Sequence, residues 1–484
     1  MNSPDLSVAP NAGLSGGAAV TDLKSNHLSF LETIGQSIAN VSPTFMPALA
    51  VVVVAGIAGP ASWLVYVLAT LSLLLVGLNL SRLASHYPSA GSFFVYISRS
   101  LGPLTGGLVG WGLILAYLCT AMAVVVGVAI FMAGLLKPYG LSVSPLLIYV
   151  VTVGLAWLLA YQDIRMSSRI GLLLEGVSII IILVLAVLVI GRHEGSLVDA
   201  RQLTLQGASL GSVAQAAVFA IFSFVGFESA ASLGRESRNP TRNIPRAVII
   251  STLLAGSFFV LMAYVMVLGF GGDAARLAKD PAPLDTLGAS VGVAGLGTLI
   301  YIGAVISAFA CALASINAAA RLLFSMGRYQ FVHVSMGMVH ARHHTPHVAV
   351  SVGAALTLLV PVLMLGMDIM TAFGLLGTIA TFGFVLGYFL ISVATPLYLH
   401  RTGDLRPRDI LTGVLGALAM LGAFVGSVYP APAAPYDKLP YVFLGYLGLG
   451  LIWLLALRTR APQILTSIEN DLETSETAVI GGRK

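Results

Sequence analysis

The chain has 484 residues, of which 57% are hydrophobic and only 9% are charged, and its mean hydropathy is +0.93. Soluble globular proteins carry roughly 25% charged residues, so this composition excludes an ordinary soluble domain and indicates a surface that mostly faces lipid. The net charge of +5 does not indicate a nucleic-acid binder, because Lys and Arg occur in short clusters between apolar segments and form no basic stripe. The two cysteines and the histidines show no spacing typical of a metal site, and we expect neither a metal nor a cofactor.

The chain begins with a polar segment, residues 1–28, that is rich in Gly, Ala and Ser and lacks the basic start and apolar core of a signal peptide. We expect it to be a disordered cytoplasmic tail. The same interpretation applies to the polar, acidic C-terminal segment 461–484. Between the tails, residues 29–460 are predicted to form one transmembrane domain.

About twelve apolar segments in this domain approach the ~20 residues that a helix needs to cross a bilayer. They are continuous and do not alternate as the strands of a membrane barrel would, so the predicted fold class is an all-α polytopic membrane protein. The segments are 33–56, 60–81, 103–135, 145–161, 170–190, 212–234, 247–270, 296–324, 347–366, 369–399, 410–428 and 441–457.

The distribution of Lys and Arg predicts the orientation of the domain. With twelve spans and a cytoplasmic N-terminus, most of the 25 basic residues lie on the cytoplasmic side, as the positive-inside rule requires. The outer side then holds only Lys137, Arg192, Arg201, Arg276, Lys279 and Lys438. We therefore expect a multi-pass protein of the cell membrane (inner or plasma membrane), with both termini cytoplasmic.

The first segment contains a predicted helix break. Pro43 lacks an amide hydrogen and disfavours continuation of the helix, and Asn40, Ser42 and Thr44 beside it can satisfy the freed backbone groups. The alternative interpretation is a plain proline kink, which is common in membrane helices.

The sixth segment carries Gly226 and Glu228 in mid-helix. An ionised Glu at a helix centre costs ~2.5–3.5 kcal/mol on insertion scales, so it must face a partner or water. A carboxylate in a salt bridge within the bundle is the structural alternative.

Two interrupted helices five positions apart in the helix order point to an inverted repeat with a central binding site. The amides exposed at one half-helix end attract a carboxylate, and the carbonyls at the other attract an ammonium group. This pattern indicates a zwitterionic amino acid as the solute.

Other polar residues in the spans carry weaker signals. Glu175 lies in the fifth segment, where we expect either a packing role near Arg169 or a proton relay. Ser307 and Ser315 are expected to bond their own backbone four residues earlier. Tyr117 and Phe373 are expected to pack, with pocket lining as the alternative.

Several motifs resemble those of the amino acid–polyamine–organocation (APC) permeases. They are Tyr87 to Tyr96 (YPSAGSFFVY), Phe222 to Ser229 (FSFVGFES), Glu236 to Arg246 (ESRNPTRNIPR) and Arg321 to Arg328 (RLLFSMGR). The resemblance covers about residues 30–458, and the FSFVGFES segment with its ESRNPTRNIPR continuation is the most specific part.

This resemblance implies a leucine-transporter-like fold of five plus five inverted helices that works by alternating access. The repeats would be residues 29–191 and 209–400, followed by two further helices in 408–458. The implied substrate site lies between the broken first and sixth helices. It would comprise Ala39, Ser42, Thr44, Phe45, Phe222, Val225, Gly226 and Glu228, with Glu228 as a coupling residue. Glu175 is the second, less favoured candidate for coupling, on its own position in a span and apart from the resemblance.

The chain departs from the family where members usually have a Gly-Ser-Gly break, because it has Val41-Ser42-Pro43-Thr44. Pro43 removes one amide that could bind a carboxylate, which leaves an amine or polyamine open as the substrate. We expect a proton-coupled symporter for amino acids, with sodium coupling or exchange also open. The sequence shows no cluster of catalytic residues of the kind that a membrane enzyme needs. A transporter-like sensor is the remaining alternative.

Overall fold

The computed structural model describes residues 23–464 except 88, 163, 193–197, 281, 294 and 463. Both predicted tails therefore lie almost wholly outside the described residues. Within the described part the chain is helical, and the only strand-like pairing there is an isolated bridge between Leu28 and Ser237. The predicted all-α class is confirmed.

Ten of the described helical segments are long and apolar enough to cross a membrane. One of them, Pro47–Ala84, contains the predicted span 60–81 and the end of the predicted span 33–56, and the 17-residue α14 is a shorter apolar helix. Together with α1, these helices account for all the predicted apolar segments, of which 33–56 and 212–234 contain internal non-helical residues. The protein is thus a polytopic integral membrane protein.

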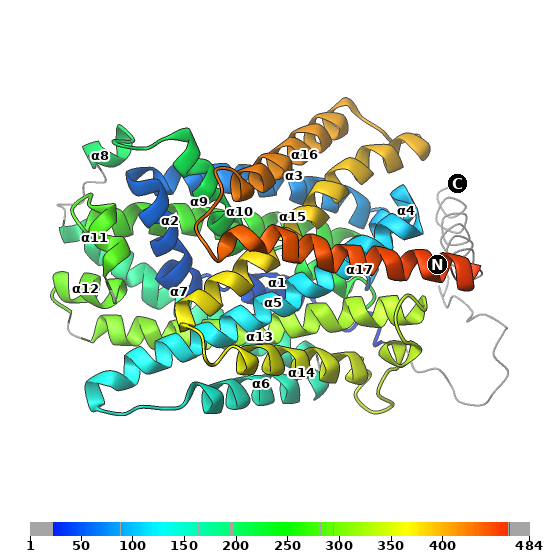
Figure 1. The fold of residues 1–484 in the computed structure, drawn as a ribbon, viewed down its shortest axis with the longest axis horizontal. Helices are drawn as coiled ribbons and strands as arrows, with labels where there is room; N and C mark the ends of the chain where they lie inside the picture. The colour runs from blue at the N-terminus through cyan, green and yellow to red at the C-terminus, as the bar shows by residue number, and fades with distance from the viewer. Residues whose placement is uncertain are drawn as a thin grey trace, which may run out of the picture.

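The long helices run side by side along the horizontal direction of Figure 1. In chain order the helices of the spans are α1 (Phe30–Val41), the short and steeply inclined α2 (Val52–Ala58), α3 (Ser62–Ala84), α5 (Pro103–Leu136), α6 (Pro145–Gln162), α7 (Ile164–Arg192), α9 (Leu210–Phe224), α10 (Pro240–Gly269), α13 (Leu296–Arg328), α14 (His347–Leu363), α15 (Ile369–Arg401), α16 (Pro407–Val428) and α17 (Leu439–Arg460). The short helices are α4 (Phe93–Leu101), α8 (Ala200–Leu203), α11 (Ala274–Lys279) and α12 (Pro283–Ser290), and the turns that matter for the site are the π-helix η1 (Pro47–Val51) and the 3₁₀-helix η4 (Ser229–Leu233).

Proline and glycine explain several of these boundaries. α5 begins at Pro103, directly after Gly102 with φ 92°, a conformation that glycine adopts without strain. Proline is tolerated at the first helical position because its missing amide hydrogen has no partner there. α5 then runs through the centre of the bundle, where 89% of its most apolar stretch is buried, against 22% for the last span.

The helix contacts support the predicted repeat. α5 packs against α15 as α13 packs against α7, and α3 packs against α9 as α10 packs against α1. α5 also packs against α6 as α13 packs against α14. If the first ten spans are numbered in chain order, each of the first five corresponds to the span five places later. Replacing both helices of one contact by their counterparts then gives the other contact of the same pair, which is the relation expected of two repeats of five. α16 and α17 lie outside this scheme and pack on α15.

The bundle has one end at which the arginines concentrate, here called the basic end, where α3, α13 and α15 finish and α7 and α10 begin. It lies to the right in Figure 1, and α11 and α12 lie at the opposite end. At the basic end Arg321 of α13 donates from Nε to Glu236 Oε2 at 2.7 Å and from Nη2 to Oε1 at 3.1 Å. Both side chains are 1% exposed, so this bidentate pair is fully desolvated.

The Arg321–Glu236 pair generates a prediction for stability. Arg321→Ala leaves Glu236 buried without its cation and should lower the free energy of unfolding by about 3–5 kcal/mol. Thermal unfolding of the purified protein in detergent measures this, and Arg328→Ala, an exposed arginine of the same helix, is the matched control. The double variant Arg321→Ala/Glu236→Ala should recover part of the loss. Equal stability of the Arg321 and Arg328 variants would show that the pair is not structural.

Candidate functional site

The first span is interrupted where the sequence predicts. α1 ends at Val41, and Ser42 has the left-handed conformation φ 54°, ψ 63°. The Ser42 amide donates to Ile38 O at 3.2 Å and the Met46 amide to Ser42 O at 3.1 Å, with no regular α-helix between. The chain then continues as η1 from Pro47. The simple-kink alternative does not describe this segment, because α-helical geometry is lost from Ser42 to Thr44.

The sixth span is interrupted at the predicted glycine. α9 ends at Phe224, Gly226 has φ 99°, and the chain resumes as η4 at Ser229. A side chain at Gly226 would place its Cβ 2.4 Å from Cγ of Asn40. Glycine is therefore required here both by conformation and by space, and the two interruptions lie in contact with each other.

Two buried side-chain groups at the first interruption have no hydrogen-bond partner within the described structure. Asn40 Oδ1 accepts from Ser315 Oγ at 2.5 Å, but Asn40 Nδ2 is unpartnered, as is Thr44 Oγ1. Both side chains are 0% exposed. Buried polar groups nearly always have a partner, so these two groups make the first interruption a candidate site for a polar solute.

Glu228 is held between two tyrosines. Tyr117 of α5 donates to Glu228 Oε1 at 2.6 Å, and Tyr388 of α15 donates to Oε2 at 2.7 Å. Among the described residues no Lys or Arg lies within ion-pair distance of this carboxylate. The salt-bridge alternative for Glu228 is therefore wrong, and Tyr117, which we expected to pack, contacts the carboxylate directly.

Glu175 lies beside the first interruption, away from Arg169. Ser307 of α13 donates to the carboxylate, with its Oγ 2.7 Å from Oε1 and 2.9 Å from Oε2, and the same Oγ lies 2.8 Å from Ser42 Oγ. The Phe45 amide also points at this oxygen, at 3.4 Å. Arg169 instead donates to Glu32 at the start of α1, so our expectation that Glu175 lies near Arg169 was wrong.

The expectation for Ser307 and Ser315 was also wrong. Both hydroxyls bond side chains of other helices, Glu175 and Asn40, and Cys311 one turn from each donates its thiol to Asn40 O at 3.0 Å. These α13 residues form a polar stripe that follows the interrupted part of the first span.

Aromatic rings surround the same region. Phe45 packs edge to face with Phe131 at 5.4 Å and with Phe373 at 6.0 Å between ring centroids. Phe222 packs against Phe373 at 6.1 Å. Three spans thus place the rings of Phe45, Phe222 and Phe373 in one cluster on the side of the interruptions away from the basic end.

The eight predicted substrate-site residues are all buried and lie on the two interruptions or directly beside them. Ala39 packs with Ala310 and Ala314 of α13, and Val225 and Gly226 form the turn that follows Phe222. Sequence reasoning missed Tyr388 and the roles of Ser307 and Ser315. A polar residue in an apolar span was the only signal for these three residues.

Comparison with known proteins identifies relatives over most of the chain. The sequence model of the family described as "Amino acid permease" matches residues 33–428. The branched-chain amino acid permease of Bacillus subtilis (strain 168) is 27% identical over 374 residues, which cover 72% of this chain and 76% of that protein. The low-affinity putrescine importer of Escherichia coli (strain K12) is 29% identical over 331 residues, 66% and 71% of the two chains.

A third relative, an uncharacterised transporter of Mycobacterium tuberculosis (strain H37Rv), is 30% identical over 359 residues, 73% of this chain and 76% of that protein. These matches agree with the motif resemblance and with the interrupted helices. The chain therefore belongs to the amino acid permease family, within the APC permeases.

Proposed function

We propose that this protein is a secondary active transporter of amino acids that binds its substrate between the interruptions of α1–η1 and α9–η4 and works by alternating access. The observation that carries the proposal is the contact between two helix breaks, with unpartnered buried donors of Asn40 and Thr44 at one of them. Backbone groups at membrane depth are expensive unless they bind something. By the positive-inside rule the basic end is the cytoplasmic end.

The carboxylate of the substrate binds at the α1 break in this proposal. Pro43 has no amide to donate, but Asn40 Nδ2 and the Thr44 hydroxyl on either side of it supply two side-chain donors. The substrate ammonium faces the carbonyl groups near Ala39, Phe222 and Val225 and the Glu228 carboxylate. Phe222, with Phe45 and Phe373, closes the site.

A diamine or polyamine is the second candidate substrate. One relative is named a putrescine importer, and Glu228 offers an anion to an ammonium group whether or not the substrate has a carboxylate. The two candidates differ in their use of Asn40 and Thr44, because an amine has no acceptor for these donors.

Coupling rests on the two buried carboxylates in this proposal. Each Glu228 oxygen has its own phenol donor, whereas Glu175 shares the single hydroxyl hydrogen of Ser307. A buried carboxylate with few donors gains most from binding a proton or a cation. We therefore assign the coupling ion, a proton or less favoured sodium, to Glu175 with Ser42 and Ser307, and substrate binding to Glu228.

The proposed function is tested by uptake of radiolabelled amino acids and amines into proteoliposomes, with and without a pH gradient and with and without sodium. Concentrative uptake of at least one amino acid is expected. If no solute of a broad panel accumulates or exchanges, the transporter-like sensor becomes the better account.

Variants at the α1 break separate amino acids from amines. Asn40→Ala and Thr44→Val should each weaken amino acid binding by about 10- to 150-fold, because each removes one hydrogen bond to a buried charge, worth ~1.5–3 kcal/mol. Both variants should leave amine binding unchanged. Competition against labelled substrate measures both affinities. Thr357→Val, in α14, removes a buried hydroxyl that bonds only its own helix at Gly353 O and serves as the control. Equal losses for amino acids and amines would contradict the assignment.

The two glutamates should respond differently to neutralisation. Glu175→Gln should abolish gradient-driven accumulation but retain exchange of internal for external substrate, since exchange needs no net ion movement. Glu228→Gln should raise the substrate concentration for half-maximal exchange, because the ammonium loses its anion. Parental accumulation by Glu175→Gln, measured at matched expression, would show that coupling resides elsewhere.

Phe222 is the best test of closure. Phe222→Ala removes a buried ring packed on Phe373 and should reduce the maximal transport rate about tenfold or more, with a smaller effect on binding, as expected for a residue that closes the site. Phe222→Tyr keeps the ring and is the control. Unaltered transport kinetics of Phe222→Ala would remove it from the site.

A further inference from the structure

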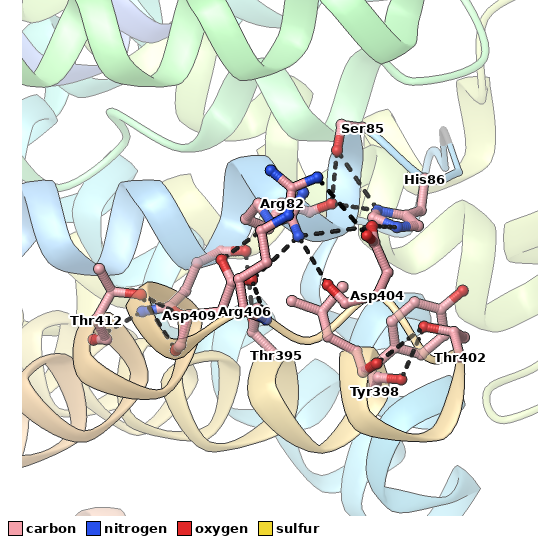
Figure 2. Close-up of polar contacts among 12 residues, drawn as sticks. Arg82, Ser85, His86, Thr395, Tyr398, Thr402, Asp404, Arg406, Asp409 and Thr412 are labelled. Atoms are coloured by element: carbon pink, nitrogen blue, oxygen red, sulfur yellow. Dashed lines mark hydrogen bonds and ion pairs between the residues drawn. The ribbon is translucent and has the colours of Figure 1, made fainter.

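Several arginines at the basic end are neutralised by carboxylates of the protein. Figure 2 shows one such group, in which Arg82 of α3 donates to Asp409 from Nε and from Nη2, each at 3.1 Å. In the same group Arg406 Nη2 lies 3.8 Å from Asp404 Oδ1. Further pairs are Arg321–Glu236, Arg165–Glu32 and Arg169–Glu32. These cations already have their counter-charges within the chain.

Arg242 and Arg246, near the start of α10, have no such partner. Both are exposed, and neither side chain makes a hydrogen bond or an ion pair with a described residue. The sequence has no Asp or Glu between Glu236 and Asp273, and Glu236 is bound to Arg321. Two like charges four residues apart on a helix repel each other, so this part of α10 gains from an anion supplied from outside the chain.

The two arginines continue an exposed apolar face of the same helix. At 3.6 residues per turn, Arg242, Arg246, Ile250, Leu253 and Leu254 all lie within about 120° of the helix circumference. The three apolar side chains are 38%, 43% and 55% exposed, in chain order. We call these five residues the α10 strip. It places two cations at the end of a continuous apolar surface.

The α10 strip has the length of one leaflet of a bilayer. Leu254 lies eight residues after Arg246, about 12 Å along the helix axis, and half of a ~30 Å hydrocarbon layer is ~15 Å deep. α10 is described throughout, and none of its residues after Ser257 is exposed. The exposed face is therefore confined to the half of α10 next to the basic end.

α3 forms one side of the strip. Ser81 Oγ donates to Pro245 O at 3.3 Å, and a side chain at Gly77 would place its Cβ 3.4 Å from Val248. Leu78, which follows Gly77, adds an apolar side chain that is 38% exposed. The strip thus lies beside a tightly packed and largely apolar helix.

We propose that the α10 strip binds one anionic phospholipid of the cytoplasmic leaflet, with its phosphate at the two arginines and an acyl chain along the apolar residues. Guanidinium groups bind phosphate oxygens through paired, charge-assisted hydrogen bonds. The positive-inside rule assigns the basic end to the cytoplasm, and the cytoplasmic leaflet is the one that carries a negative surface potential. A soluble phosphate would use the arginines alone and gain nothing from the apolar part of the strip, whereas a lipid uses both. The site is separate from the proposed substrate site and does not depend on transport.

Lipid binding is measured by native mass spectrometry of the purified full-length protein in detergent, titrated with phosphatidylglycerol or with phosphatidylcholine of the same acyl chains. Phosphatidylglycerol should bind about 30-fold more tightly, which corresponds to ~1 kcal/mol for each arginine. Arg242→Gln/Arg246→Gln should abolish this preference and leave the affinity for phosphatidylcholine nearly unchanged. Arg242→Lys/Arg246→Lys keeps both charges and should retain most of the preference.

The matched control is Arg458→Gln/Arg460→Gln at the end of α17. These arginines are also exposed at the end of a lipid-facing helix, but they lie about 200° apart around it and cannot share one headgroup. This variant should keep the parental preference, and an equal loss in both glutamine variants would overturn the site in favour of the general charge of the basic end. Equal binding of the two lipids to the unmodified chain would also overturn it. Displacement of phosphatidylglycerol by glycerol 3-phosphate at equal concentration would show a simple anion site and overturn the assignment to a lipid.

Discussion

The structure depends on a single constraint, that a peptide group inside a membrane protein must find a partner. Ser42 to Thr44 and Val225 to Glu228 leave regular helix geometry in the middle of the bundle. Such backbone is tolerated only where protein or a solute satisfies it. The surrounding helices are arranged to do so: α13 offers Ser307, Cys311 and Ser315 along the first break, and α5 and α15 offer one tyrosine each to the second. The central, most buried helices are those that supply polar groups to the breaks.

The same constraint distinguishes the surroundings of the two buried carboxylates and the roles that we propose for them. Each oxygen of Glu228 has a phenol donor, one from α5 and one from α15, so its charge is stabilised by fixed groups that also hold these two helices together. Glu175 has one serine hydroxyl, and this hydroxyl is itself shared with Ser42 of the break. A charge that the protein stabilises poorly is the one that a mobile proton or cation can neutralise. In the proposed mechanism, the position of Glu175 beside Ser42 connects that neutralisation to the geometry of the break.

Sequence alone was sufficient for the spans and the breaks because both depend on local chemistry. Pro43 lacks an amide wherever it lies, and a glycine followed by a glutamate in an apolar span is costly in any fold. The partners were beyond reach for a physical reason: which face of α13 or α15 meets a break is determined by the packing of helices far apart in the sequence. Ser307 therefore seemed a residue that bonds its own helix, Arg169 seemed a neighbour of Glu175, and nothing distinguished Tyr388 from the other polar residues of the apolar spans. The predicted break singled out Asn40 as a polar residue beside it. It did not predict that Asn40 Oδ1 accepts a hydrogen bond from Ser315 or that Asn40 Nδ2 has no partner among the described residues.

α15 is the element in which these features meet. Its first half carries Phe373 against Phe45 and Phe222, its middle carries Tyr388 against Glu228, and its last turns carry Tyr398 against His86 and Tyr87. An α-helix with intact internal hydrogen bonds resists bending over such a length, so a displacement at one of these contacts must be accommodated at the others. Pro396, inside the helix between Tyr388 and the basic end, is the one point where an internal hydrogen bond is missing by necessity. Motion between the proposed substrate site and the basic end is therefore most easily absorbed there, and the aromatic contacts on either side of that proline determine how much of it reaches the two helix breaks.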